Sequence, residues 1–340
     1  MNSLRKEKWC DRKILVTGGA GFIGSYLAER LLEEGASVVV LDNLSTGKRE
    51  NLEPFYAYEK RFEFIEGDLR DPEVCKKAVS GCDFVLHEAA LGSVPRSIAD
   101  PLTTFDVNAR GFANIITAAK DAGVKRFVYA SSSSVYGDDS SAVKVEEKTG
   151  NLLSPYAVSK RSNELLALNF GKVYNFKTIG LRYFNVIGKR QDATSPYAAV
   201  IPRFIAALKA HQSPTIYGDG TNARDFTHVQ NVVEANLCAL TTNHQDAFHR
   251  IYNIACGKST SLIELFYLLR AEMAKHDPEV SGIEPLFGPP RQGDIANSLA
   301  EISSAAEFLQ YNPIFHLQEA IAFLFSEESD GKKCRIYRHK

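Results

Sequence analysis

The chain has 340 residues, and its 40 basic and 41 acidic residues leave a formal net charge of −1 at neutral pH. Such a balance argues against a nucleic-acid groove built on bulk charge, so no nucleic-acid partner is predicted. The length is sufficient for one large domain or two interdependent domains.

The six cysteines form no C-x-x-C pair and the eight histidines form no H-x-x-x-H pair. We therefore expect free thiols in a reducing, cytoplasmic setting and no metal site. The polar segment Met1–Asp11 is not expected to be a signal peptide, and no apolar run has the length to span a bilayer. His87 ends an apolar run and is interpreted as a core residue.

The first predicted elements surround a glycine-rich turn. Lys13–Thr17 is an apolar strand, Thr17–Gly24 contains the glycines, and a helix follows from Phe22 with apolar residues at helical spacing. Gly35 is expected at the helix C-terminus, and a second strand, Ser37–Leu41, ends at Asp42. This order is that of a dinucleotide fingerprint, in which glycines admit the pyrophosphate and the acid binds the adenosine ribose.

Two glycine spacings fit that fingerprint: Gly19, Gly21 and Gly24, or Gly18, Gly21 and Gly24. A carboxylate at Asp42 would repel a 2′-phosphate, so NAD is predicted in preference to NADP. The alternative is a tight turn that binds no ligand.

Strands and helices then alternate. Further strands are predicted at Phe62–Ile65, Asp83–His87, Arg126–Ala130 and Lys177–Arg182, and helices at Pro72–Val79, Pro101–Ala122 and Pro155–Lys172. The alternation predicts an α/β fold, a Rossmann-like doubly wound parallel sheet with ligands at the strand C-termini.

Beyond Gly188 prolines interrupt shorter elements, which indicates a smaller C-terminal α/β substrate domain. We predict an NAD-binding domain over 1–187 with a returning segment near 225–257, where the strand Arg250–Ala255 rejoins the sheet. The substrate domain is predicted over 188–224 and 258–330. The basic tail 331–340 is expected to be a solvated terminus, with weak contact to an anionic membrane surface as the alternative.

Tyr156 and Lys160 stand four residues apart on a predicted helix that Ser154 caps and Pro155 begins. A cation near the Tyr156 hydroxyl favours the phenolate and lowers its pKa. Such a tyrosine can take a proton from an alcohol while hydride leaves the same carbon. A surface helical pair without function is the alternative.

These motifs resemble the extended short-chain dehydrogenase/reductases that act on nucleotide sugars. The resemblance covers roughly residues 12 to 325 and includes Ser131–Ser134, Leu181–Val186, Tyr217–Gly220, Arg224–Phe226 and Arg291–Asp294. The segment Ala89–Ser97 is similar to that of UDP-N-acetylglucosamine 4-epimerases of bacterial surface-polysaccharide (lipopolysaccharide) synthesis.

The resemblance implies a mechanism of transient oxidation. Tyr156 takes the C4 hydroxyl proton, C4 hydride passes to NAD, and hydride returns to the other face of the 4-keto sugar. Lys160 tunes Tyr156, and Ser132 or Ser133 hydrogen-bonds the C4 oxygen; a satisfied serine loop is the alternative.

The resemblance also implies two sets of binding residues. The cofactor set comprises Gly18, Gly21, Phe22, Ile23, Gly24, Asp42, Asn43, Ser45, Thr46, Gly47, Asp68, Leu69, Ala89, Asn108, Tyr156, Lys160, Tyr183, Asn185 and Val186. The substrate set comprises Ser93, Ser132, Ser133, Tyr156, Asn185, Ala199, Val200, Tyr217, Arg224, Arg291, Asp294 and Ser298. For Asp68 a helix cap ahead of Pro72 is the alternative.

Ser298 carries the substrate prediction. In the family a tyrosine at this position restricts the enzyme to 2-hydroxyl sugars, whereas a small residue leaves room for an N-acetyl group. We therefore expect interconversion of UDP-GlcNAc and UDP-GalNAc; the alternatives are UDP-glucose/UDP-galactose and UDP-uronic acids. A Ser298 that merely faces solvent would remove this support.

Other members of the superfamily are less compatible with the sequence. Dehydratases and decarboxylases carry acids directly after the active-site hydroxyl residue, where this chain has Ser133 and Ser134. A non-catalytic NAD-binding regulator would be expected to lose Tyr156 or Lys160. The family also implies a homodimer through a four-helix bundle, to which we assign Ile115, Ile116, Ala119, Leu165, Leu166 and Leu168.

Overall fold

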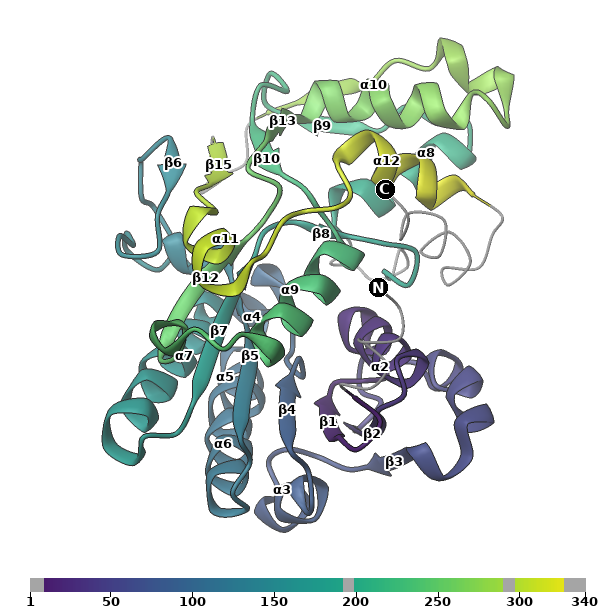
Figure 1. Cartoon of the computed structure of the whole chain (residues 1–340). Helices are drawn as coiled ribbons and strands as arrows, with labels where there is room; N and C mark the ends of the chain where they lie inside the picture. The colour runs from purple at the N-terminus through teal and green to yellow at the C-terminus, as the bar shows by residue number, and fades with distance from the viewer. Residues whose placement is uncertain (1–8, 192–198, 290–296, 327–340) are drawn as a thin grey trace.

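The computed structural model describes residues 9–191, 199–289 and 297–326. Its centre is a seven-stranded parallel sheet in the order β12-β7-β5-β4-β1-β2-β3 (Figure 1). The strands are β1 (Lys13–Thr17), β2 (Ser37–Asp42), β3 (Phe62–Glu66), β4 (Phe84–His87), β5 (Arg126–Ser132), β7 (Thr178–Tyr183) and β12 (Arg250–Ile254). The predicted doubly wound parallel sheet is confirmed.

Helices cover both faces of this sheet. One apolar cluster joins β1 and β2 to α2 (Phe22–Glu33), α9 (Val229–Thr241) and α11 (Ser303–Leu309). A second cluster, on the opposite face, joins the sheet to α3 (Pro72–Val79), α6 (Gly111–Asp121) and α7 (Pro155–Tyr174). Burial on both faces explains why the central strands are almost continuously apolar.

The predicted elements agree with the observed ones within a few residues, with one exception. The expected helix Pro101–Ala122 consists of α5 (Pro101–Phe105), a π-helical turn at Asp106–Arg110, and α6. As predicted, Gly35 lies just past α2 with a φ of 101°, and its N–H donates to the Leu32 carbonyl at 3.1 Å.

A smaller region lies beyond the carboxyl edge of the main sheet (Figure 1). Its strands form a four-stranded sheet, β13-β10-β15-β6, and two pairs, β11-β8 and β14-β9. Its own apolar cluster joins α8, α10 and α12. The elements are β6 (Val143–Lys144), β8 (Val186–Ile187), α8 (Val200–Lys209), β9 (Thr215–Tyr217), β10 (Ala223–Asp225), β11 (Thr227–His228), β13 (Ser259–Ser261), α10 (Leu262–Met273), β14 (Leu286–Gly288), β15 (Asn297–Ala300) and α12 (Leu317–Phe325).

The strand β12 returns to the edge of the main sheet beside β7, as predicted for Arg250–Ala255. The exact domain boundaries remain a prediction. Within the described ranges no helix is both long and apolar enough to cross a membrane. In these ranges Cys75, Cys82 and Cys256 are buried thiols.

Candidate active site

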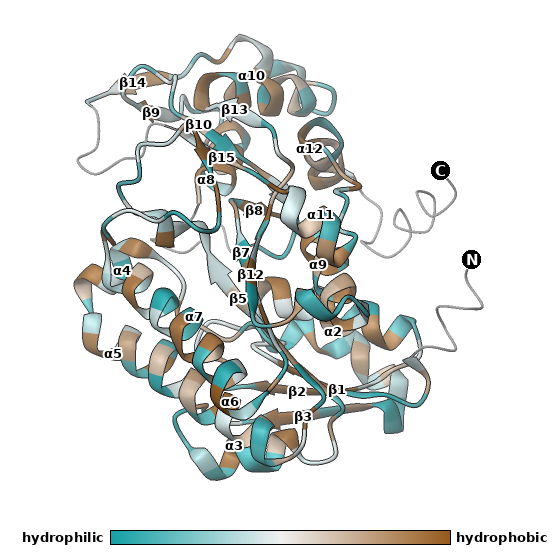
Figure 2. Ribbon diagram, turned by 60° about the vertical axis from the view of Figure 1, so that its left-hand side comes forward, coloured by the Kyte–Doolittle hydropathy of each residue, from teal (hydrophilic) through white to brown (hydrophobic). Residues whose placement is uncertain are grey.

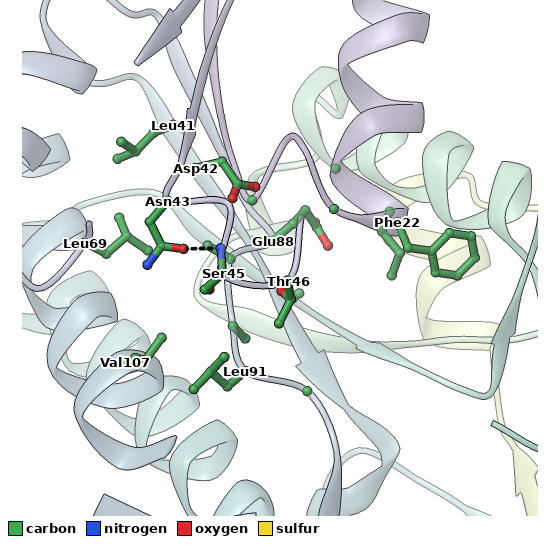
Figure 3. A pocket seen from close by; sticks show the side chains of 18 of the residues that line it. Phe22, Leu41, Asp42, Asn43, Ser45, Thr46, Leu69, Glu88, Leu91 and Val107 are labelled. Carbon is green, nitrogen blue, oxygen red and sulfur yellow. Dashed lines mark hydrogen bonds between the residues drawn. The ribbon is translucent and has the colours of Figure 1, made fainter. Parts of the chain in front are cut away.

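A cavity runs along the carboxyl edge of the sheet, where β1, β2, β4, β5 and β7 end (Figure 3). Fifteen residues of the predicted cofactor set line it: Gly18, Gly21, Phe22, Ile23, Gly24, Asp42, Asn43, Ser45, Thr46, Asp68, Leu69, Ala89, Tyr156, Lys160 and Tyr183. The topology therefore brings the glycine turn and the Tyr156–Lys160 pair to one cavity.

The glycine turn is packed so closely that side chains cannot replace its hydrogens. A Cβ on Gly24 would lie 2.2 Å from the Gly18 carbonyl oxygen, and one on Gly18 would lie 2.7 Å from the Ala89 nitrogen. Gly18 also has a φ of 69°. A Cβ on Gly19 would also lie 2.6 Å from the Val40 side chain, so close packing fits both spacings, and Gly18 differs from Gly19 by its positive φ.

Helix α2 begins directly after this turn without a side-chain cap on its first N–H groups. Uncapped N–H groups at a helix N-terminus suit a pyrophosphate. At the end of β2 the Asp42 carboxylate accepts hydrogen bonds from Ala20 N at 3.0 Å and Leu44 N at 2.8 Å. Burial raises the Asp42 pKa, and these two backbone bonds oppose the rise. These residues fit a dinucleotide with a free ribose diol.

Asp68 is held beside the cavity by Asn43 and Arg70. Arg70 donates to its carboxylate at 2.7 Å, and the Arg70 hydrogen bond is the main reason why the Asp68 pKa falls to about 2. The alternative interpretation of Asp68 as a helix cap is wrong, because α3 is capped by Asp71, which accepts from Glu73 N at 2.9 Å.

Four residues of the predicted cofactor set do not line the cavity: Gly47, Asn108, Asn185 and Val186. Gly47 lies against Ala20 and Asp42. Asn108 is buried, and its amide bonds both backbone groups of Leu91 and the Ser159 hydroxyl. Asn108 thus holds the Leu91 loop against the cavity, and its contact with NAD stays a prediction.

Tyr156 lies in the first turn of α7, which Ser154 caps by accepting from Ala157 N at 3.1 Å. Lys160 is buried, its Nζ donates to the Ala130 carbonyl at 2.9 Å, and it lies 6.0 Å from the Tyr156 ring centroid. Burial lowers the Lys160 pKa to about 8, although Glu88 and Glu164 favour its charged form.

The expected lowering of the Tyr156 pKa is not observed, and the prediction was wrong in sign for this structure. Burial raises the Tyr156 pKa, the Ser132 hydroxyl lowers it, and the negative charge of Glu88 raises it. The rise of the Tyr156 pKa has a physical cause. Burial removes water from the phenolate and the Glu88 carboxyl lies nearby, and neither effect can be inferred from the spacing of Tyr156 and Lys160.

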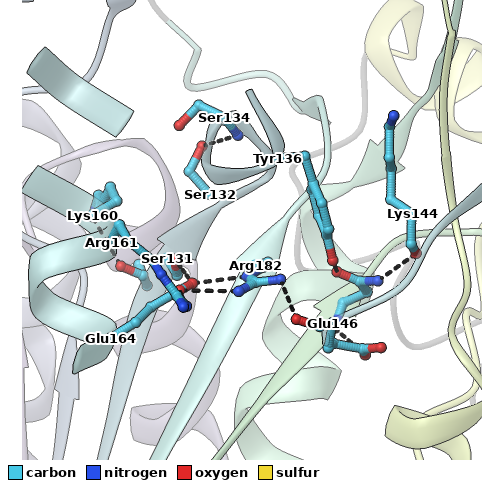
Figure 4. A network of polar contacts seen from close by, with 12 residues as sticks. Ser131, Ser132, Ser134, Tyr136, Lys144, Glu146, Lys160, Arg161, Glu164 and Arg182 are labelled. Atoms are coloured by element: carbon cyan, nitrogen blue, oxygen red, sulfur yellow. Dashed lines mark hydrogen bonds and ion pairs between the residues drawn. The ribbon is translucent and has the colours of Figure 1, made fainter. Parts of the chain in front are cut away.

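The four serines after β5 have different roles. Ser131 donates to the buried Glu164 at 2.6 Å, and Ser132 caps the turn Ser133–Tyr136 by accepting from Ser134 N at 3.2 Å (Figure 4). Of the described serines, Ser132 is the one whose hydroxyl lowers the Tyr156 pKa, which favours Ser132 over Ser133 as the hydroxyl partner.

Behind this cavity Glu164 and Arg182 form a fully buried ion pair at 2.8 Å (Figure 4). Glu164 also accepts from Arg161 at 2.8 Å, and Arg182 donates to the Glu146 carbonyl at 3.0 Å. The charged partners hold the Glu164 pKa below its usual value. This network fixes the middle of α7 to the ends of β5 and β7.

Of the predicted substrate residues that the structure describes, Tyr156 is the one that lines this cavity. Arg224 on β10 pairs in register with Ser298 on β15, so two residues distant in sequence lie side by side. Ser298 is 8% exposed, which makes the solvent-facing alternative wrong. Ser93 caps α4 (Val94–Ala99) with a φ of 108°, a conformation that is costly for serine.

The remaining substrate residues are distributed around this region. Asn185 donates to the Asp225 carbonyl at 2.9 Å, Ala199 and Val200 begin α8, and Tyr217 ends β9. Arg291 and Asp294 lie outside the described residues, so their predicted contacts stay predictions.

Sequence reasoning missed nine residues that line the cavity: Leu41, Gly67, Glu88, Ala90, Leu91, Gly92, Val107, Ala130 and Ser131. Most contribute a strand end or a loop, which the position of the sheet edge could have indicated. Glu88 is different, because it brings a carboxyl group into the cavity.

Comparison with known proteins identifies the class. Residues 14–255 match the NAD dependent epimerase/dehydratase family, and the chain belongs to it. The cofactor is therefore NAD, as predicted.

Individual relatives are similar over nearly their whole length. A putative UDP-glucose 4-epimerase of Methanocaldococcus jannaschii is 37% identical over 91% of this chain and 95% of its own. A UDP-N-acetylglucosamine 4-epimerase from Methanobrevibacter ruminantium, solved with UDP-N-acetylmuramic acid, superposes with a TM-score of 0.84 at 36% identity, covering 94% of this chain and 99% of its own. A Thermotoga maritima UDP-glucose 4-epimerase with UDP-glucose gives 0.83 at 33% identity, covering 92% and 97%. The predicted enzyme class, an isomerase, is confirmed.

Proposed function

We propose that this protein interconverts the C4 epimers of a UDP-sugar, and that its preferred pair is UDP-GlcNAc and UDP-GalNAc. The observation that supports the reaction is the single cavity shared by the glycine turn, Tyr156 and Lys160. Relatives named as UDP-glucose and UDP-N-acetylglucosamine 4-epimerases support the substrate class.

Bound NAD supplies reversible hydride transfer at the sugar C4. Tyr156 takes the proton of the C4 hydroxyl and gives it back after the ketone has turned. Ser132 hydrogen-bonds the Tyr156 hydroxyl and orients it. Lys160, fixed by the Ala130 carbonyl, supplies positive charge that favours the phenolate when the proton moves.

The other reactions catalysed within the family, dehydration and decarboxylation, find less support. Ser133 and Ser134 occupy positions where a dehydratase or decarboxylase would need carboxyl groups, and the turn that they begin contains neither Asp nor Glu. A plain epimerase needs no acid or base besides Tyr156, and the absence of Asp and Glu from this turn is compatible with that.

The N-acetyl preference is supported by Ser298. It is small and buried next to Arg224, which we propose as a diphosphate ligand together with Arg291. A buried small residue beside the nucleotide-binding arginine leaves space for an acetamido group, whereas a tyrosine would fill it.

The direct test is incubation of the purified protein with UDP-GlcNAc, UDP-GalNAc, UDP-glucose and UDP-galactose, followed by chromatography. We expect the acetylated pair to interconvert faster. Ser298→Tyr should abolish the acetylated activity and spare some conversion of UDP-galactose, and Ser298→Ala, which stays small, should retain both. Parental UDP-GalNAc turnover by Ser298→Tyr would refute the assignment of Ser298 as the gate.

We further propose that a second copy of this chain covers an apolar surface on α5 and α7. Leu102 is 83% exposed, and Phe105, Leu153 and Val158 are also exposed around one groove. Figure 2 shows these helices along the side of the molecule away from the two termini. Such a patch suits a helical dimer interface.

The interface differs from the one predicted in its residues. Ile115, Ile116 and Ala119 are fully buried in the core of the monomer and cannot meet a partner. Leu165 is 55% exposed and remains available. Leu102→Asp should produce monomers in light scattering, whereas Leu286→Asp, which changes an exposed leucine on β14, should not. A dimeric Leu102→Asp would contradict the proposal.

Cytoplasmic localisation stays a prediction.

A further inference from the structure

Glu88 directly follows His87, the last residue of β4, and its carboxyl group lies in the cavity wall (Figure 3). Tyr156, Lys160 and Tyr183 line the same cavity. The residue is half-buried. No role assigned above uses this side chain.

A chain of hydrogen bonds fixes the carboxyl group. The Asn236 amide nitrogen donates to the Tyr183 hydroxyl oxygen at 2.8 Å, and the Tyr183 hydroxyl lies 2.8 Å from Glu88 Oε1. Since the Asn236 nitrogen can only donate, the Tyr183 proton is directed to Glu88. Glu88 therefore accepts this bond and needs no proton of its own to make it.

The charged groups around Glu88 come from several elements. Lys160 and Tyr156 face it from α7, Tyr183 from β7 and neutral Asn236 from α9. Neighbouring His87 is buried and neutral, with a pKa of about 3 caused by burial and by Lys160. Lys160 is thus the only cation that acts on Glu88 among the described residues, and no hydrogen bond joins the two.

We propose that Glu88 is a positioning residue that anchors Tyr183 and supplies the negative charge that balances Lys160 inside the cofactor cavity. An oxidised nicotinamide carries a positive charge and a reduced one is neutral. A carboxylate in the same cavity therefore favours NAD over NADH, and it offsets the opposite preference of Lys160.

This role depends on pH in a defined direction. Burial raises the Glu88 pKa to about 7, while the Tyr183 hydrogen bond and Lys160 hold it down. The carboxylate is present above that value and is lost as the pH falls through it. The preference for NAD over NADH should therefore weaken between pH 8 and pH 6.

The test is Glu88→Gln, which keeps the size of the side chain and an acceptor for Tyr183 but removes the charge. Dissociation constants of NAD and NADH are measured by calorimetric titration at pH 6 and pH 8. At pH 8 we expect the affinity ratio of NAD to NADH to fall roughly tenfold in the variant, the order expected for one charge in a partly buried site. The part of the pH dependence of this ratio that comes from Glu88 should also be lost, which leaves only the change caused by Lys160.

Glu146→Gln is the matched control. Glu146 is also a carboxyl whose pKa burial raises, but it accepts from Asn253 N at 2.8 Å away from the cavity. The affinity ratio of NAD to NADH in Glu146→Gln should equal that of the parent. Tyr183→Phe is a second variant. It keeps the charge of Glu88 but removes the hydrogen bond that lowers the Glu88 pKa, so the pH at which the NAD-to-NADH affinity ratio changes should move upward.

A folded Glu88→Gln variant with the parental ratio at pH 8, or with the parental pH dependence, would overturn the proposal. If the pH at which the affinity ratio changes is the same in Tyr183→Phe as in the parent, this result would overturn the proposal independently. Because both readouts measure nucleotide binding alone, they depend on the NAD cofactor and not on the sugar. A failure of the UDP-sugar assignment would leave them unchanged.

Discussion

Helix α7 contributes to two buried charged centres that differ in how completely their charges are paired. In the first, Glu164 accepts from Arg182, Arg161 and Ser131, so its pKa is lowered. In the second, Glu88 and Lys160 share no hydrogen bond, the Glu88 pKa rises to about 7 and the Lys160 pKa falls to about 8. One centre stabilises its charges and the other destabilises them.

The difference separates structural from functional roles. A fully paired buried ion network holds strands and helices in place, whereas buried groups with pKa values moved toward neutrality can exchange protons near physiological pH. Four residues along α7 thus separate Lys160, whose pKa burial lowers to about 8, from Glu164, whose charge is fully paired.

The paired centre can be broken at Glu164. Glu164→Gln leaves Arg182 buried beside a neutral side chain, and we expect a loss of about 3–5 kcal/mol in the free energy of unfolding. Denaturant unfolding followed by circular dichroism measures it. Glu73→Gln, in an exposed pair with Lys76, should leave the unfolding unchanged. An equally small effect of both variants would mean that the network does not stabilise the fold.

The unpaired centre can be tested at Tyr156. Tyr156→Phe removes only the proton-carrying group, so we expect turnover to fall by about a hundredfold or more while NAD still binds. Steady-state rates and calorimetric NAD titration measure the two effects. Near-normal epimerisation by this variant would exclude Tyr156 as the acid/base.

Asp42 sharpens the comparison, because we expect it to bind the adenosine ribose through fixed geometry and not by proton exchange. Asp42→Asn should weaken NAD by about tenfold and relax the rejection of NADP, since the charge that repels a 2′-phosphate is gone. Competitive titration of the two nucleotides tests this. An unchanged preference would place Asp42 away from the adenosine ribose.

The cofactor half of the site was predictable because its signals are local. The turn Thr17–Gly24, the strand that ends at Asp42 and the pair Tyr156–Lys160 each lie within one or two consecutive elements. The parallel sheet with helices on both faces then follows from the alternation of strands and helices.

Glu88 was not predictable in the same way. Its partner Tyr183 lies 95 residues further along the chain. Only the fold brings the end of β4 and β7 to one cavity. Burial is the main reason why the Tyr156 pKa rises, and the negative charge of Glu88 adds to that rise.

The assignment of Ile115 and Ile116 to a dimer surface failed for a related reason. Helical periodicity identifies an apolar face but does not reveal whether that face meets the sheet or a partner. The π-helical turn at Asp106–Arg110 has no sequence signal that we could identify.

The central claim is that the sugar C4 is oxidised and reduced again within one cavity. It is tested most directly with UDP-GlcNAc that carries deuterium at C4, incubated with the protein in ordinary water. The account predicts that the UDP-GalNAc product retains the deuterium at C4, because hydride leaves and returns without meeting solvent. Loss of the deuterium to water would contradict transient oxidation and would require a different mechanism of epimerisation.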